Sequence, residues 1–490
     1  MDHLVNKIIL VIFLSIALGD LNMEGFYEGQ FGRNYESDEF IWNMWDPNLY
    51  LETRLHGSPA NNSSYYIKFY ANKDYELSNQ PLAIFSEGNI NFSQNFNKYG
   101  MSATLFSRES RHYWIDGSML GIVNTNIVNN DGNGQGVRFD LWHQYNGSMT
   151  YVMSDYSQGG GDDIHLLRYR QSLLNKKLNF GIFFQRKQYS TGDFNDYNQV
   201  IAQDLKFNIG QYYVMIEIAH SKVPNDSLIT TLSKQYRNSN FINSNFAIKS
   251  ELSGLKIGNS KYGFWYFKPG IFSYGDTYRN YMGDNQSNRY GYWINSYYLV
   301  PKRAITISLN YSFYEKLVAD TIPVFLDSLY LKEIHDPSTN LSTEIYIEFI
   351  NGFKGKFVFN KHDENWQGQL YKHYDILSEL SVENNLAKLL AQFKVKDVGE
   401  IWERHVAGIE LSVNLTESWR FFTRGLISND RVGSRYSIFT ELQYRISGNT
   451  ELYLQYGPSY WGQYGLVNDD AFTSSGSMKK ELRFIIKGWF

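Results

Sequence analysis

Apolar and polar residues alternate along most of this chain. In the stretch 387–396, Leu389 and Phe393 fall on one face of an extended backbone, while Lys394 and Lys396 fall on the other. A period of two residues is typical of a β-strand whose two faces meet different surroundings. The same alternation recurs in the stretches 204–209, 214–219, 246–252, 409–415 and 435–445. Each run extends over about ten residues, which is the length that a tilted strand needs to cross a lipid bilayer.

The connections between these runs are alternately short and long. Asn, Gly and Pro mark many of the short ones, and these residues are typical of hairpin turns. The short turns are Asn146-Gly147, Pro301 to Arg303, Asn351 to Phe353, Thr416 to Ser418 and Ser447 to Asn449. The longer polar stretches are 32–46, 109–133, 223–240, 274–288, 315–339 and 459–477. This alternation predicts an up-and-down antiparallel barrel with short turns at one rim and long loops at the other.

The runs predict an all-β fold, a single large transmembrane β-barrel of about 24 strands, within a range of about 22 to 26. Each strand and its connection then take up about 20 residues, which suits such a barrel. The strands near 82–96 and 373–384 have the weakest pattern, and the segments 114–123 and 315–335 are candidates for short helices within outer loops.

The first residues predict export. The weakly basic start MDHLVNK precedes the apolar run IILVIFLSIALG, and Ala17 and Gly19 stand at positions −3 and −1 of a cut before Asp20. This pattern predicts a signal peptide at 1–19 and a β-barrel at 20–490. The apolar run is too short for a membrane-spanning helix and no later stretch is longer, so we expect strands to make any span.

Composition narrows the chemistry. Aromatic residues make up 17% of the chain, yet its mean hydropathy is −0.42. Strands with one face in lipid and the other in water would produce this combination, and so would a water-soluble all-β protein rich in Tyr. The net charge of −4 gives no reason to expect a nucleic-acid partner. The chain has no Cys, which excludes disulfides, thiolate metal sites and a cysteine nucleophile.

We expect neither enzymatic activity nor a cofactor or metal. The stretch Asn129 to Asp140 has some of the spacing of a calcium loop, but Asp140 falls in a predicted strand, so a flexible loop is the favoured interpretation. Asp162, Asp163 and His165 could form an acid–base set at the outer rim. Against catalysis, the sequence has no Gly-x-Ser-x-Gly motif and no phosphate-binding loop.

Charged residues of both signs occupy the polar faces of the predicted strands. They either brace the wall as cross-strand ion pairs or set the selectivity of an aqueous pore, and the two roles are compatible. The candidates for lining the lumen are Arg168, Arg170, Lys206, Glu217, Lys249, Glu251, Glu344, Glu348, Lys354, Lys356, Lys394, Lys396, Glu410, Glu441 and Arg445.

Aromatic residues cluster near the ends of the predicted strands. The favoured interpretation is an interfacial girdle, and the alternative is a track inside the lumen on which sugars stack. These residues are Trp42, Trp45, Tyr50, Tyr65, Tyr66, Trp293, Tyr297, Tyr298, Trp419, Tyr460, Trp461 and Trp489.

The chain ends inside a strand-like pattern, KKELRFIIKGWF, whose apolar face carries Leu482, Phe484, Ile486 and Phe490. Together with the signal peptide, the alternating runs and the alternating connections, this ending resembles the bacterial outer-membrane β-barrel superfamily. Gly488 departs from the family pattern, in which a bulky apolar residue is usual. The resemblance implies that the first strand, near Met23 to Phe31, pairs with the last, and that the outer-membrane insertion machinery reads the terminal strand.

The same resemblance implies a location in the outer membrane of a Gram-negative bacterium, in contact with its lipid. We expect a channel or porin that passes small solutes or polysaccharide by diffusion through the barrel lumen. The inward-folded loops of such a channel would be sought first in 109–133 and 315–339. The alternative is a structural or adhesive surface barrel with an occluded lumen, whose outer loops bind partners.

Overall fold

Antiparallel pairing of strands that are neighbours in sequence organises the part of the chain that the structure describes. The computed structural model describes residues 22–36, 39–41, 49–72, 84–107, 118–123, 135–155, 163–191, 194–223, 245–275, 277–283, 289–300, 304–324, 328–350, 352–366, 369–458, 466–467 and 480–490. The strands are β1 (Asn22–Glu36), β2 (Glu39–Ile41), β3 (Leu49–Ala60), β4 (Ser63–Asn72), β5 (Ile84–Asn95), β6 (Tyr99–Ser107), β7 (Gln135–His143), β8 (Gly147–Asp155), β9 (Asp163–Leu173), β10 (Leu178–Thr191), β11 (Phe194–Ile209), β12 (Tyr212–Lys222), β13 (Phe246–Ser253), β14 (Leu255–Asn259), β15 (Gly263–Tyr274), β16 (Arg289–Leu299), β17 (Ala304–Val324), β18 (Ser328–Ile350), β19 (Phe353–Trp366), β20 (Gln369–Glu383), β21 (Ala387–Lys396), β22 (Arg404–Asn414), β23 (Trp419–Asp430), β24 (Gly433–Ser447), β25 (Thr450–Tyr456) and β26 (Lys480–Trp489).

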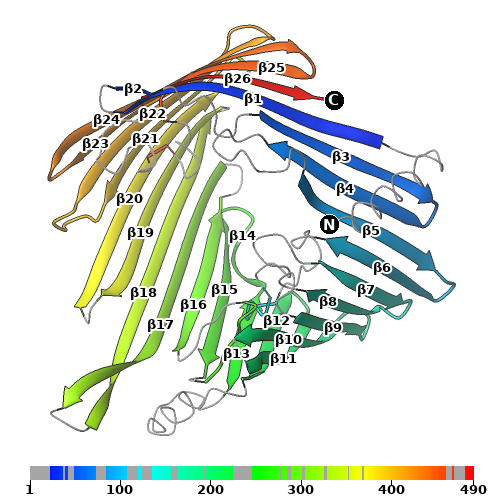
Figure 1. Ribbon diagram of the computed structural model, residues 1–490. Coiled ribbons are helices and arrows are strands. Elements are labelled where there is room, and N and C mark those ends of the chain that lie inside the picture. Colours follow the sequence, from blue (N-terminus) through cyan, green and yellow to red (C-terminus); the bar gives the residue numbers. More distant parts are fainter. Residues whose placement is uncertain are drawn as a thin grey trace.

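These 26 segments occupy 24 positions around one closed barrel (Figure 1). Strands β2 and β3 both pair with β1, and β13 and β14 both pair with β15, so each of these two pairs counts as one position. The backbone between β13 and β14 bends at Gly254, whose φ is +87°. The predicted antiparallel up-and-down barrel of about 24 strands is therefore confirmed. Among the described residues, no helix is long and apolar enough to cross a membrane.

The barrel closes through its first and last strands. Strand β1 pairs with β26 from Phe26 opposite Trp489 to Tyr35 opposite Lys480. The terminal Phe490 extends this ladder, because its N–H donates to the Gly25 carbonyl at 3.1 Å and its carbonyl accepts from the Gly25 N–H at 2.8 Å. Closure leaves no unpaired edge at this seam.

The strands on either side of the five predicted short turns meet at one rim. These turns connect β7 to β8, β16 to β17, β18 to β19, β22 to β23 and β24 to β25. Every second connection of an up-and-down barrel lies at the same rim, and these five belong to the rim where β1 begins and β26 ends. We call this the turn rim and the opposite one the loop rim.

Segment 315–339 is a strand hairpin, and the predicted outer loop with a short helix at 315–335 is wrong. Strands β17 and β18 stay paired from Ala304 opposite Glu348 to Val324 opposite Ser328. Their outer neighbours β16 and β19 stop earlier, so the hairpin projects beyond the rest of the loop rim (Figure 1). A short apolar run does not distinguish helix from strand, and here each arm of the hairpin supplies the other's backbone partners.

Other uncertain segments are resolved in part. The stretches 82–96 and 373–384 fall largely within β5 and β20, as predicted. Residues 118–123 form turns and bends instead of the short helix predicted for 114–123, and residues 114–117 lie outside the described residues. Within the predicted connection 32–46, residues 32–36 and 39–41 belong to strands. The predicted signal peptide lies outside the described residues.

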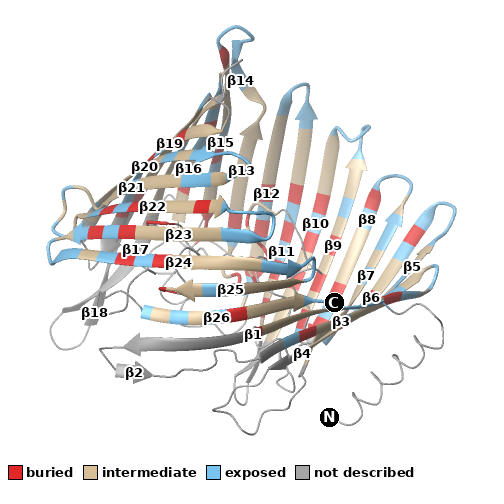
Figure 2. Ribbon diagram, turned by 90° about the horizontal axis from the view of Figure 1, so that it is seen from above, coloured by how far each residue is buried: buried red, intermediate tan, exposed pale blue. Residues whose placement is uncertain are grey.

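The two faces of the wall differ in chemistry. On β21 and β22, the side chains of Phe393 and Ile409 are 44% and 52% exposed on the outer face. Lys394 and Glu410 lie on the inner face of the same strands. The most buried wall positions of β8 to β12 and of β22 to β24 belong to the inner face, where segments of the loop-rim connections cover them (Figure 2).

Candidate functional site in the barrel lumen

All the residues predicted to line the lumen lie on one face of the ladder. Cross-strand partners share a face, so the register carries the assignment from strand to strand. The face is that of Arg168, Asp204 and Glu217, against which the inward segments pack. The residues on this inner face are Arg168, Arg170, Lys206, Glu217, Lys249, Glu251, Glu344, Glu348, Lys354, Lys356, Lys394, Lys396, Glu410, Glu441 and Arg445.

Many of these charges have a partner of opposite sign on the next strand. Glu344 pairs with Lys356 at 2.8 Å. Glu410 pairs with Arg424 at 2.8 Å, and Glu251 pairs with Lys268 at 3.0 Å. Further pairs join Lys394 to Asp375 at 3.4 Å and Arg445 to Glu451 at 3.1 Å. Partly exposed pairs of this kind each contribute up to about 1 kcal/mol. This arrangement is the bracing role expected from the sequence, and it also lines the lumen with both signs of charge.

The most buried ion pair joins two strands that are not neighbours. Arg168 on β9 donates to Asp204 on β11, with both side chains 9% exposed. The strand between them, β10, passes beneath the pair at Gly181. A Cβ at this position would clash with the Asp204 carboxylate and lie 2.9 Å from Arg168 Nη1. Only glycine therefore leaves room for the pair to cross β10.

Glu217 holds one inward-folded segment, residues 118–123. Its Oε1 accepts from Ser118 Oγ at 2.5 Å, and its Oε2 accepts from the N–H groups of Met119 and Leu120 at 2.6 and 3.1 Å. The carboxylate is 4% exposed. Three donors from one loop satisfy a carboxylate that would otherwise be buried at a large free-energy cost. This inward folding was expected for the connection 109–133, of which 118–123 is the described part.

Asn198 on the wall and Asn280 within the segment itself hold a second inward segment, residues 277–283. Asn198 on β11 donates to the Arg279 carbonyl and accepts from the Tyr281 N–H, both at 3.1 Å. Asn280 donates to the carbonyls of Gly121 and Ile122 at 3.3 and 3.1 Å, which joins the two inward segments to each other. Both asparagines are fully buried. Buried amides with good partners fix a loop in one position, because losing a partner leaves an unsatisfied polar group.

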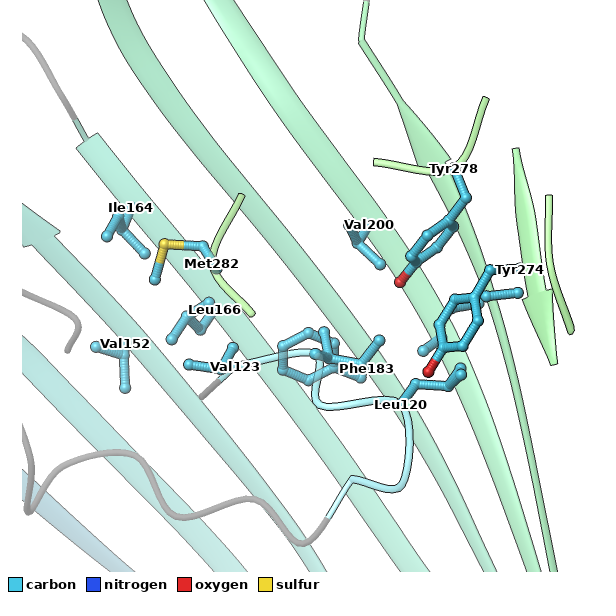
Figure 3. Close-up of a cluster of buried hydrophobic side chains, with 14 of the residues drawn as sticks. Leu120, Val123, Val152, Ile164, Leu166, Phe183, Val200, Tyr274, Tyr278 and Met282 are labelled. Carbon is cyan, nitrogen blue, oxygen red and sulfur yellow. The ribbon is translucent and has the colours of Figure 1, made fainter. Parts of the chain in front are cut away.

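An apolar cluster lies between these two segments and the wall. Leu120, Ile122 and Val123 come from the first segment, and Tyr278 and Met282 come from the second. They pack on wall residues from β6 to β15, which include Val152, Leu166, Phe183 and Val200 (Figure 3). Side chains of this size gain about 1.5 to 3 kcal/mol each when they are fully buried. The cluster therefore stabilises the inward position of both segments.

A third inward contact lies on a different sector of the wall. Leu466 and Val467, from the connection between β25 and β26, pack on Val406, Leu426 and Phe439. A Cβ at Gly408 would lie 2.8 Å from Leu466 Cγ, so glycine at this position makes room for the contact. Inward segments therefore narrow the lumen from two sectors, one at β6 to β15 and one at β20 to β24.

The girdle interpretation fails for at least four of the aromatics. Tyr66, opposite His56, and Trp489, opposite Phe26, lie on the inner face. Trp293 and Tyr297 on β16 lie on the inner face, opposite Gly270 and Tyr266, whereas Tyr298 lies on the outer face. Of the proposed acid–base set, Asp162 lies outside the described residues, and His165 Nδ1 lies 2.9 Å from Tyr151 Oη. Among the described residues, no group of three or more His, Asp or Glu side chains could hold a metal.

The sequence prediction missed the residues that position the loops. Asp204 stands on the polar face of a recognised strand, so its inner location followed from the pattern, but its partner on β9 did not. Asn198 and Asn280 carry no such signal, because their partners lie 81 to 159 residues away in the chain.

No protein-family model matches the sequence, and no curated protein is detectably similar to it. Several solved structures are similar in shape. The ferric enterobactin receptor PfeA of Pseudomonas aeruginosa has a TM-score of 0.45 at 8% identity, over 96% of this chain and 80% of the receptor chain. The siderophore receptor PirA of Pseudomonas aeruginosa has a TM-score of 0.44 at 9% identity, over 96% and 80% of the two chains. The P pilus usher PapC translocation pore has a TM-score of 0.42 at 10% identity, over 96% and 99%. At this level of similarity the comparison adds nothing to the barrel fold described above.

Proposed function

We propose that this protein is a passive transport barrel of the outer membrane of a Gram-negative bacterium, passing small polar solutes through a lumen narrowed by its own loops. The observation that carries the proposal is the division of the closed wall into an apolar outer face and a charged inner face. The proposal gives the chain no enzymatic role and no cofactor.

The outer face supports contact with lipid. Exposed apolar side chains recur along the outer face, as with Leu389 and Phe393 on β21 and Ile409 on β22. A water-soluble protein would rarely expose so much contiguous apolar surface. In a bilayer the same apolar surface contacts lipid tails. Every backbone group of a closed barrel already has a hydrogen-bond partner within the wall.

The inner face supports an aqueous lumen. Ion pairs such as Glu344–Lys356 and Glu410–Arg424 are only partly buried and need water around their remaining polar atoms. A barrel of this strand number also encloses more space than side chains alone fill. The inward segments restrict this space, which favours passage of small solutes over large ones.

The terminal strand supports outer-membrane insertion. Leu482, Phe484 and Ile486 lie on the outer face of β26, and Phe490 completes the seam with Gly25. A substituent at Gly25 would clash with the Phe490 ring. We propose that this apolar edge is presented to the insertion machinery before β1 pairs with it.

Conductance tests the proposal directly. The purified protein, inserted into planar lipid bilayers in potassium chloride, is expected to give discrete, ohmic current steps. A wild-type barrel that inserts but gives no steps would overturn the transport proposal. That outcome would favour the structural or adhesive alternative, in which the same loops occlude the lumen.

A further inference from the structure

A lane of aromatic rings follows the inner face of β15 and β16. Near the turn rim it begins with Phe264 and Tyr266, and Tyr266 stacks on Tyr297 with ring centroids 4.6 Å apart and planes 12° apart. Farther along, Trp293 lies over Gly270 and its ring centroid is 6.1 Å from that of Phe272. We call Phe264, Tyr266, Tyr297, Trp293 and Phe272 the aromatic lane.

The lane ends at the inward-folded loop. The ring centroids of Phe272 and Tyr274 are 5.8 Å apart, and those of Tyr274 and Tyr278 are also 5.8 Å apart. Tyr274 and Tyr278 are buried in the apolar cluster, whereas Tyr297 is 45% exposed. The open part of the lane therefore runs from the turn rim to the narrowed level of the lumen.

Lysines accompany the rings. The Lys256 Nζ lies 3.5 Å from the ring centroid of Phe264 and 5.5 Å from that of Tyr266. Lys249 Nζ lies 5.1 Å from the ring centroid of Trp293. Lys268, between the two groups of rings, pairs with Glu251. The strip carries three lysines and two glutamates, of which Glu217 lies opposite Lys249, so its net charge is positive.

Packing of the wall does not account for the stacked pair. Tyr297 is nearly half exposed on the inner face, where its cross-strand neighbours are Tyr266 and Ser308. Sugar rings are suited to such a surface, because a face of C–H groups packs on an aromatic face while the hydroxyl groups point sideways into water or to polar side chains. The lysines would add attraction for carboxylates on the sugar.

We propose that the aromatic lane is a binding track for acidic oligosaccharides, in which the rings stack on the sugars and Lys256 and Lys249 attract their carboxylates. This inference rests on the proposed transport function and names the class of solute that the lumen favours. The stacked pair Tyr266–Tyr297 is its central subsite.

The same two strands offer a matched control. Trp265 and Tyr298 occupy the adjacent register position on the outer face and stack with centroids 5.0 Å apart and planes 25° apart. Tyr297→Leu and Tyr298→Leu therefore remove one ring each from equivalent stacked pairs on opposite faces of the wall. Correct folding of both variants is checked by the shift in electrophoretic mobility on heating.

Isothermal titration calorimetry of the detergent-solubilised protein, with hexagalacturonate as the acidic probe and maltohexaose as the neutral one, tests the inference. We expect hexagalacturonate to bind the wild type and the Tyr298→Leu variant equally, and the Tyr297→Leu variant at least about tenfold more weakly. Lys256→Gln should weaken hexagalacturonate binding and leave any maltohexaose binding unchanged.

The inference is overturned by absence of hexagalacturonate binding to the wild type, by equal effects of the two tyrosine variants, or by equal affinity for both probes. Because binding is measured without current, a barrel that conducts but does not bind would refute the track alone, and one that binds without conducting would refute the channel alone.

Discussion

Single glycines on the inner wall decide which side chains can meet across it. Gly181 lets Arg168 reach Asp204, Gly408 makes room for Leu466, and Gly270 makes room for the Trp293 indole. In each case the added Cβ of any other residue would meet a side chain from another strand or loop. A glycine at such a position matters because its missing side chain leaves space for other groups. The glycine itself makes no chemical interaction that would reveal this role.

Gly181→Val is expected to separate the Arg168–Asp204 pair. Breaking a buried ion pair typically costs about 3 to 5 kcal/mol, because it leaves charges without a partner in a low-dielectric site. The thermal unfolding midpoint, followed by the loss of heat-dependent mobility on gels, should fall by several degrees. Gly448→Ala is the control, since a Cβ there meets no atom within 4 Å. An equal loss in both variants would mean that the ion pair does not stabilise the wall.

Inward-folded connections are the elements that separate this barrel from an open tube. The segments 118–123 and 277–283 are fastened to the wall by Glu217 and Asn198 and to each other by Asn280. A polar anchor and an apolar cluster act together at the same place. Removing one anchor should therefore loosen a segment without unfolding the strands beneath it.

Glu217→Ala is expected to raise single-channel conductance. The variant leaves Ser118 and the N–H groups of Met119 and Leu120 without their shared acceptor, so the first segment should leave the lumen for part of the time. Current traces should show a larger or more frequent open level than in the wild type. The control Glu344→Gln removes the same charge from the inner wall, far from the inward segments in the register. If both variants conduct alike, Glu217 acts through its charge and not through the loop.

Local pattern predicted the strands well and the loops poorly, for a physical reason. The faces of Leu389 and Lys394 follow from the alternation within one strand. The turn at Asn146-Gly147 is indicated by two adjacent residues. The contact of Asn280 with Gly121 spans 159 residues and depends on barrel closure, which no short window of sequence contains. The hairpin at 304–350 was missed because a short apolar run suits either a helix or a strand. Trp293 and Tyr297 were assigned to the girdle because position near a strand end does not reveal which face a ring occupies.

The two faces of the closed wall are suited to two different solvents, lipid outside and water inside. Its outer face presents apolar residues, its inner face carries ion pairs, and the seam between β1 and β26 removes the last open edge. The distinction between the faces depends on every strand keeping its register, since a slip of one residue would exchange them.

Ile409→Lys is expected to impair membrane insertion strongly. The residue lies near the middle of β22 on the outer face, and a lysine at the bilayer midplane costs about 2 to 4 kcal/mol. The yield of heat-modifiable barrel after folding into vesicles should fall. Gln392→Lys, one strand away on the inner face, should fold like the wild type. Equal yields for both lysines would argue against a lipid-facing position for Ile409.

Alternate accessibility of one strand to water tests the central claim most directly. The chain has no Cys, so single Cys variants at each position from 388 to 395 on β21 can be labelled with a membrane-impermeant maleimide in vesicles without detergent. The account predicts labelling at Lys388, Leu390, Gln392 and Lys394, and protection at Leu389, Ala391, Phe393 and Val395. Uniform labelling along the strand, or labelling of the second set in preference to the first, would contradict it.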